Sequence, residues 1–364
     1  MPKRVVAVPA SQPPLFDVVS HGRQGPGGRI RLSPGQIEAV ARTVRRVPEV
    51  MVKVSGGARD MAGAKAHFAY IDRHGKLEIH TDDGRDLVGK EAAAELVEDW
   101  NLDLSKGQYR PAPAEGEKDT RPKVVHNIVL SMPARTPPQA VLAAARTFAR
   151  ESFALQHRYA MVLHEDQQHP HVHLVVKGEH EYEPGKRLYI RKATLRQWRD
   201  DFARALREQG VAANATPRQV RGENRSTKKD AIHQRLRGIA EYERLPERDK
   251  AKRRAPKGSS FMRRKVEQIA RELQAGTLAP EPGKAKLDAT RKTVRAGWLA
   301  TADVLRSQGQ APLAGEVEAF VKSMPAAKTD KEMIAAGLLA RIEARRQRGV
   351  LPDNAQAAKR GGEG

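Results

Sequence analysis

The chain has 364 residues, of which 39% are hydrophobic, 4% aromatic and 30% charged, so it suits one modest core with long polar helices and not a densely buried enzyme of this length. A formal net charge of +22 favours a polyanionic partner, and the usual one is nucleic acid. No apolar run approaches the length of a membrane span, and the lack of cysteine excludes disulfides and thiolate metal sites, so any metal must bind through His, Asp or Glu.

The first 122 residues predict an irregular arm followed by short helices and strands. Residues 1–30 are rich in proline and glycine, which is typical of irregular structure. A helix is expected to start at Ser33 and Pro34, because apolar residues then recur on one face. The elements expected next are a strand over 50–59, a short helix or strand over 66–71, a strand over 76–80, a helix over 90–100 and a loop over 111–122.

From residue 123 the chain alternates clearly between strands and helices. The β-branched run KVVHNIVLSM predicts a strand that stops at Pro133. Amphipathic helices are expected over 137–153 and over 194–210, the second one capped by Gly210. Between them lie two predicted strands, RYAMVLH and HVHLVVKG, joined by a charged turn. The alternation, with its adjacent antiparallel pairs, predicts an α/β (α+β) fold in which helices pack on a sheet.

The character of the chain changes near residue 222. Two basic, breaker-rich stretches flank a helix over residues 223–259, and residues 260–364 are expected to form a helical C-terminal region. That region contains no constellation of reactive side chains, so its expected role is to bind partners. The functional part of the chain is therefore expected within residues 1–222.

Four of the 12 histidines lie in a ten-residue stretch of the predicted hairpin YAMVLHEDQQHPHVHLVVKG. His171 and His173 are two apart on a strand, so both rings project from one face, and His164 reaches the same face from the neighbouring strand. A lone strand histidine is ordinarily a satisfied core or surface residue. Three converging imidazoles instead predict a divalent metal site with open positions, in which Asp166 orients one ring and His169 contacts substrate or metal. Such an ion polarises a phosphoryl oxygen.

The motifs together resemble those of the HUH endonucleases, specifically conjugative and mobilisation relaxases of the MOBP class. HEDQQHPHVHLVV is similar to their histidine motif, and AHFAYIDRHGKLEI to their nucleophile motif. NIVLSMPARTPP and LRQWRDDFARALREQGVAANATPRQVRG resemble the segments that precede and follow the histidine hairpin. The resemblance covers residues 1–222 and implies an HUH-type fold, a central antiparallel sheet flanked by helices that cover one face. It further implies a metal-dependent enzyme, using Mg²⁺ or Mn²⁺, that nicks one DNA strand at an origin of transfer and rejoins it.

The resemblance implies that Tyr70 is the nucleophile and forms a 5′-phosphotyrosine, that His164, His171 and His173 hold the metal, and that Ser131 contacts DNA. A phenolate suits this role because it is also a good leaving group, which keeps the reaction reversible. Core packing beside Phe68 is the alternative for Tyr70. Basic residues near these motifs are each ordinary solvated charges, but as a set they predict a track for single-stranded DNA. They are Arg59, Lys65, Arg73, Lys76, Arg187, Arg191 and Lys192.

Three other functions stay open at this stage. A rolling-circle replication initiator shares the chemistry, but its tyrosine typically follows the histidine motif, whereas Tyr70 precedes it. A hydrolytic metallo-phosphoesterase uses water as the nucleophile and commonly needs several carboxylate ligands, of which the hairpin offers chiefly Asp166. A non-catalytic DNA-binding module is the third. The composition and the lack of a long apolar run predict a cytoplasmic protein without membrane insertion. The family implies export with the DNA, and its expected partners are DNA of the transfer origin (oriT), relaxosome accessory proteins and a type IV coupling protein.

Overall fold

The computed structural model describes residues 16–23, 31–102, 113–114, 116–117, 119–166, 168–223, 246–250 and 260–347. The chain divides into two compact units, Glu38–Thr216 and Met1–Ile37 with Pro217–Gly364. The irregular arm over residues 1–30 and the basic segment over 223–259 lie largely outside the described residues. The domain boundaries expected at 222 and 259 stay predictions.

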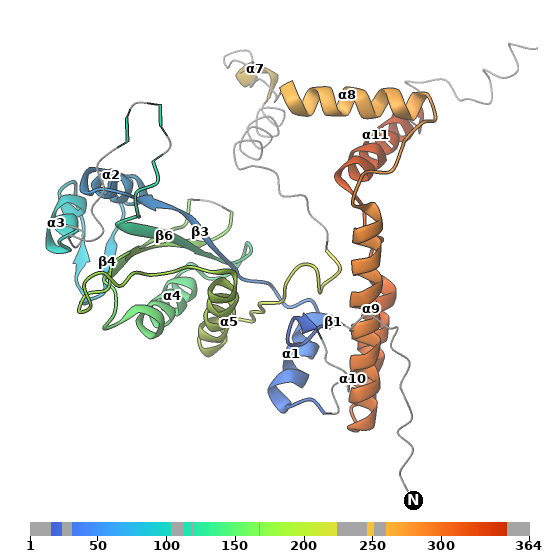
Figure 1. Cartoon of the computed structure of the whole chain (residues 1–364), viewed down its shortest axis with the longest axis horizontal. Coiled ribbons are helices and arrows are strands. Elements are labelled where there is room, and N and C mark those ends of the chain that lie inside the picture. The colour runs from blue at the N-terminus through green and yellow to red at the C-terminus, as the bar shows by residue number, and fades with distance from the viewer. Residues whose placement is uncertain are drawn as a thin grey trace, which may run out of the picture. The chain divides into compact units, whose positions relative to one another are not determined.

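The first unit is built on a six-stranded sheet whose paired strands are all antiparallel (Figure 1). The strand order is β3-β6-β8-β7-β4-β5. The strands are β3 (Met51–Ala58), β4 (Ile79–Thr81), β5 (Asp86–Leu87), β6 (Val125–Ser131), β7 (Tyr159–His164) and β8 (His171–Lys177). The β7–β8 hairpin lies between β6 and β4, so it is hydrogen-bonded to a neighbouring strand on each side.

One face of the sheet is covered by α4 (Pro138–Phe153) and α5 (Lys192–Glu208) (Figure 1). The two helices bury one apolar stripe each, which in α5 recurs every four residues at Trp198, Phe202 and Leu206. The ring of Phe148 from α4 meets Trp198 and Phe202 edge-on, with both centroid distances at 6.2 Å. This is the larger core of the unit.

The other face carries a second core beneath α2 (Met61–Ile71) and α3 (Ala92–Asp99). Phe68 and Ile71 of α2 are fully buried, and the Phe68 ring stands edge-on to Trp100 with centroids 5.5 Å apart. The antiparallel sheet with flanking helices is confirmed. The expectation that the helices cover one face is wrong, because the sheet buries apolar side chains on both faces and each face needs its own cover.

The segment over 66–71, predicted as a short helix or strand, belongs to α2. Asp60 caps this helix, and its side chain accepts a hydrogen bond from the Gly63 amide at 2.8 Å. α1 (Pro34–Val44) starts at the predicted proline. The helix after Pro137 and the helix that ends before Gly210 are likewise found as α4 and α5.

The second unit is mainly helical, as expected. Its described elements are a short hairpin of β1 (Phe16–Asp17) and β2 (Gly22–Arg23), with α7 (Glu247–Lys250), α8 (Ser260–Gln274), α9 (Lys284–Ser307), α10 (Ala311–Ser323) and α11 (Asp330–Gln347). α9 and α10 pack through Trp298 and Phe320, whose ring centroids lie 5.2 Å apart. Among the helices of the described ranges, none combines the length and apolarity needed to cross a membrane.

Candidate metal centre and nucleophile helix

The three predicted histidines converge on the sheet face that α2 and α3 cover. His164 pairs directly with His171 across β7 and β8, and His173 lies two residues further along β8. The ring centroids are 4.6 to 5.3 Å apart, and one nitrogen of each ring lies within 4.8 Å of the others. Val172 and Leu174 point to the opposite face and are fully buried there. The strand alternation thus separates the chemistry from the core.

Two of the imidazoles donate a hydrogen bond to a backbone carbonyl. His164 donates from Nε2 to the Ile71 oxygen at 2.6 Å, and His171 donates from Nδ1 to the His169 oxygen at 3.1 Å. Because a carbonyl only accepts, these nitrogens carry the protons, and the lone pairs are on His164 Nδ1 and His171 Nε2. His173 Nδ1 instead lies against the side-chain amide of Asn127, 3.1 Å from Nδ2 and 3.3 Å from Oδ1.

Burial holds all three imidazoles in their neutral form. Desolvation lowers the pKa of each of them, and for His173 desolvation with the neighbouring His164 and His171 lowers the pKa to about 3. A neutral imidazole is the form that ligates a metal. Three neutral nitrogen donors, with two rings already oriented by carbonyls, fit a divalent ion with open coordination positions.

Tyr70 lies in the last turn of α2 and is 60% exposed, so it is not a core residue. Its neighbour Ile71 is buried and supplies the carbonyl that His164 bonds. The helix end that carries the tyrosine is therefore joined to the histidine cluster by a hydrogen bond one residue away. Packing of Phe68 and Ile71 against the sheet fixes this helix from below.

Arg73 links the tyrosine to the histidines. It follows α2 in a left-handed backbone conformation (φ 58°). One guanidinium nitrogen donates to Asp166 Oδ2 at 2.6 Å and lies 3.5 Å from His164 Nδ1, while the guanidinium carbon is 5.9 Å from the Tyr70 ring centroid. One cation thus reaches a nitrogen of the histidine cluster, a carboxylate and the phenol ring.

Asp166 accepts from Arg73, and its other oxygen lies 4.0 Å from His164 Nδ1. That separation is too long for a hydrogen bond. In the structure the carbonyls of Ile71 and His169 orient two of the rings, and the role expected of Asp166 toward an imidazole stays a prediction.

Residues 89–211 match the family model "Relaxase: MobA/VirD2-like, nuclease domain". This range holds the whole β7–β8 hairpin with its three histidines. Over this range the chain is therefore similar to the nuclease domain of MobA/VirD2-like relaxases. The expected resemblance to relaxases is confirmed. Tyr70 precedes the matched range.

Among curated proteins, the chain is similar to the T-DNA border endonuclease VirD2 of Rhizobium radiobacter, with 26% identity over 201 residues, 52% of this chain and 46% of that one. For the same endonuclease of Rhizobium rhizogenes the identity is 28% over 138 residues, 35% of this chain and 30% of that one. The chain thus spans less than half the length of these relatives.

Among solved structures, the MobM relaxase domain bound to oriT DNA is 12% identical, with a TM-score of 0.32, and the match covers 50% of this chain and 98% of that one. The conjugative relaxase TrwC in complex with mutant oriT DNA is 13% identical, with a TM-score of 0.29, over 76% of this chain and 99% of that one.

Asn127 and His67 are two residues of the candidate site that sequence reasoning missed. Asn127, on β6, is only 2% exposed and also donates to Ser55 Oγ at 2.9 Å. His67 lies on α2 one turn before Tyr70, within hydrogen-bonding reach of the same amide, and its Nε2 is buried without a partner among the described residues. Burial lowers the pKa of His67. A polar residue inside an apolar strand run was the available signal for Asn127.

The other side chains predicted to contact DNA or metal differ in whether they are exposed or already hydrogen-bonded within the protein. Ser131 is buried, and its hydroxyl donates to the Pro170 carbonyl at 3.3 Å, whereas His169 is exposed. Arg59 and Arg187 both donate to backbone carbonyls, of Arg121 and Lys123 respectively. Four other predicted basic contacts have exposed side chains: Lys65, Lys76, Arg191 and Lys192.

A second group of possible ligands lies at the sheet edge and consists of Glu78, His80 and Asp86. His80 Nδ1 is 2.6 Å from Asp86, but the Arg146 guanidinium lies 2.9 Å from the same nitrogen. His80, Asp86 and Arg146 are thus already paired with one another, so this group is better explained as an ion-pair network.

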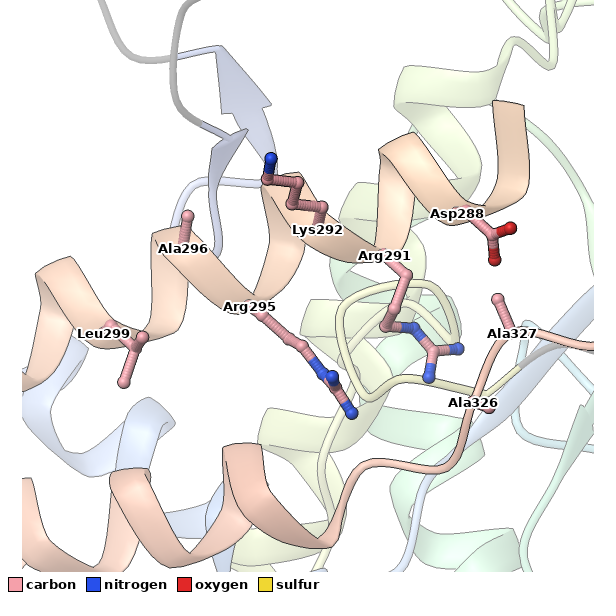
Figure 2. A pocket seen from close by; sticks show the side chains of 8 residues that line it. All are labelled: Asp288, Arg291, Lys292, Arg295, Ala296, Leu299, Ala326 and Ala327. Atoms are coloured by element: carbon pink, nitrogen blue, oxygen red, sulfur yellow. The ribbon is translucent and has the colours of Figure 1, made fainter. Parts of the chain in front are cut away.

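The helical unit has a pocket of about 490 Å³ along α9 (Figure 2). The pocket is lined by the basic side chains of Arg291, Lys292 and Arg295, and by Leu299 further along the helix. Arg291 donates to the Pro325 and Gly222 carbonyls, and Arg295 donates to the Met324 carbonyl at 2.8 Å. These two guanidiniums thus fasten loops of their own unit to α9, which is a structural role.

Proposed function

We propose that the protein is a metal-dependent relaxase that nicks one strand of DNA at an origin of transfer by attack of Tyr70, and rejoins it. The observation that supports the proposal most is the direct contact between the predicted tyrosine motif and the predicted histidine motif. The His164 bond to the Ile71 carbonyl and the Arg73 side chain bring the tyrosine helix onto the histidine cluster, although the motifs lie almost a hundred residues apart.

In the proposed reaction the Tyr70 oxygen attacks the scissile phosphorus and the bond from phosphorus to the 3′ oxygen breaks. The phenol loses its proton, the DNA keeps a free 3′-OH, and the 5′ phosphate is joined to the tyrosine. Because one phosphodiester replaces another, the 3′-OH can attack in return and reseal the strand. The exposed position of Tyr70 suits a nucleophile that must meet a polymer.

His164, His171 and His173 would hold the divalent ion, which when bound neutralises charge on the non-bridging phosphate oxygens. Mg²⁺ or Mn²⁺ is the proposed cofactor. Arg73 supplies a second, permanent positive charge beside the tyrosine, and its guanidinium is able to hold a phosphate by two parallel hydrogen bonds. Asp166 keeps that guanidinium in place through the 2.6 Å ion pair.

The bound strand is proposed to follow the exposed cations Lys65, Lys76, Arg191 and Lys192, with binding that weakens as salt rises. Arg59, Arg187 and Ser131 then act mainly by supporting loops and strands of the site. The relaxase domain is proposed to extend over residues 1–222, followed by the basic segment over 223–259 and by helices over 260–364. Accessory proteins of the relaxosome and a coupling protein are the proposed partners of those helices, in a cytoplasmic protein exported with the DNA.

The test is a nicking assay on labelled single-stranded oligonucleotides from the candidate transfer origin, with Mg²⁺ or Mn²⁺, for the native chain and Tyr70→Phe. A covalent adduct on a denaturing gel that disappears in Tyr70→Phe supports the proposal. Cleavage without an adduct in both proteins identifies water as the nucleophile, and the protein is then a hydrolase. Binding without cleavage by either protein points to a non-catalytic DNA-binding module.

A further inference from the structure

Asn127 differs in kind from the groups that orient the other two histidines of the cluster. His164 and His171 each bond a backbone carbonyl, which can only accept a hydrogen bond. The side-chain amide of Asn127 both donates and accepts, and both of its ends lie within 3.3 Å of His173 Nδ1. Two of the three rings therefore have one permitted tautomer, while the third has two.

The two tautomers of His173 differ in their ability to bind a metal. When Nδ1 carries the proton and donates to Oδ1 of Asn127, the lone pair of Nε2 is free for an ion. When Nδ1 accepts from Nδ2 of Asn127, the proton is on Nε2 and that nitrogen cannot act as a ligand. Since Nδ1 faces the amide in both cases, Nε2 is the ring nitrogen left for the ion.

The surroundings of Asn127 hold the amide in place without resolving this choice. Asn127 is 2% exposed, and its Nδ2 also donates to Ser55 Oγ at 2.9 Å. His67, on the helix that carries Tyr70, also lies within hydrogen-bonding reach of this amide. Asn127 thus joins β3, α2 and the third histidine, all on the face of the sheet that carries the site.

We infer that Asn127 is a positioning residue that sets the tautomer of His173 and through it the metal affinity of the histidine cluster. The inference rests on the proposed metal site. It predicts an order of affinities: Asn127→Asp, whose carboxylate only accepts, binds the metal most tightly, the native chain is intermediate, and Asn127→Leu is weakest. Loss of a partner that orients a metal ligand commonly reduces affinity by about 10–100-fold, and we expect a loss of that size for Asn127→Leu.

The test measures Mn²⁺ binding to the full chain at pH 8 by calorimetry and by electron paramagnetic resonance of the free ion. His173→Ala is the control for the site itself. Asn214→Asp is the matched control, because Asn214 is also buried but bonds Thr43, Glu49 and Thr216 instead of a histidine. Nitrogen-15 spectra of the histidine rings in the metal-free protein report the tautomer directly. Thermal melting identifies any variant that does not fold.

The expected result is the affinity order given above, with unchanged binding for Asn214→Asp and a greater fraction of His173 protonated at Nδ1 in Asn127→Asp than in the native chain. Equal affinities for the native chain and both Asn127 variants, together with lost binding in His173→Ala, overturn the inference and leave the metal site standing. Native protein that binds no Mn²⁺, or binding that is unaffected by His173→Ala, overturns the metal site itself.

Discussion

Replacing Arg73 by alanine is predicted to slow nicking strongly while lowering the stability of the protein only slightly. In the structure this side chain touches three site groups: Asp166, His164 and the ring of Tyr70. The ion pair to Asp166 joins side chains that are 34% and 54% exposed, so its loss costs the folded state about 1 kcal/mol or less. For a domain of this size that is a fall of roughly 2–4 °C in melting temperature.

The expected effect on nicking is much larger. Removing one positioned donor from a developing charge commonly slows a reaction about 10²–10³-fold, which corresponds to about 3–4 kcal/mol of transition-state stabilisation. The assay is single-turnover nicking of an origin oligonucleotide at saturating protein, with melting followed by circular dichroism. Arg73→Lys keeps the charge but not the planar fork, and we expect it to fall between the native chain and Arg73→Ala.

Arg204 offers a matched control for Arg73. It pairs with Glu151 at 2.5 Å, with side chains 42% and 41% exposed, on the helices of the opposite face. Arg204→Ala is expected to have a similarly small effect on melting and none on nicking. A native nicking rate in Arg73→Ala would refute the role given to Arg73, and so would an equal slowing in Arg204→Ala.

Three further predictions concern pH, backbone and metal. Burial lowers the pKa of His126 to about 4, so the unfolded chain takes up this proton near pH 6.5 and the folded chain only near pH 4. The free energy of unfolding of the metal-free protein should therefore fall on acidification through this window. In His126→Gln the fall should be smaller by about 2–3 kcal/mol. Parallel pH profiles of unfolding free energy for the native chain and His126→Gln would contradict this. Gly57→Ala should lower the free energy of unfolding in urea by about 1–3 kcal/mol, because Gly57 has a φ of 130° and an added Cβ would lie 2.1 Å from the Val125 oxygen. Gly56→Ala should cost less, because an added Cβ there meets open space. Equal costs for the two variants would be evidence against strain at Gly57. A chelator should abolish nicking, reversibly with Mn²⁺, and leave the far-ultraviolet spectrum unchanged; nicking that persists in chelator argues against a metal.

The histidine cluster was predictable because it depends on local geometry alone. Strand alternation puts His171 and His173 on one face whatever the rest of the fold, and a tight hairpin returns His164 beside them. The same alternation turns Val172 and Leu174 to the opposite face, where both are buried in the core. The clear amphipathic periods of α4 and α5 were predictable for the same reason.

Features that depend on packing between distant segments were not predictable from the sequence. The short apolar run HFAYI fits a buried strand or helix equally well, and only its packing over the second face of the sheet makes it a helix. That packing brings the Ile71 carbonyl to His164 and gives Asp166 an arginine partner in place of an imidazole. The role of Asn127 likewise needed the register between β6 and β8.

The central claim is that Tyr70 becomes covalently joined to DNA, and peptide mapping tests it most directly. Native protein is incubated with an origin oligonucleotide and Mn²⁺, then digested with nuclease and protease, and the peptides are analysed by mass spectrometry. The account predicts a nucleotide adduct on the peptide that contains Tyr70. An adduct on any other residue would contradict the claim.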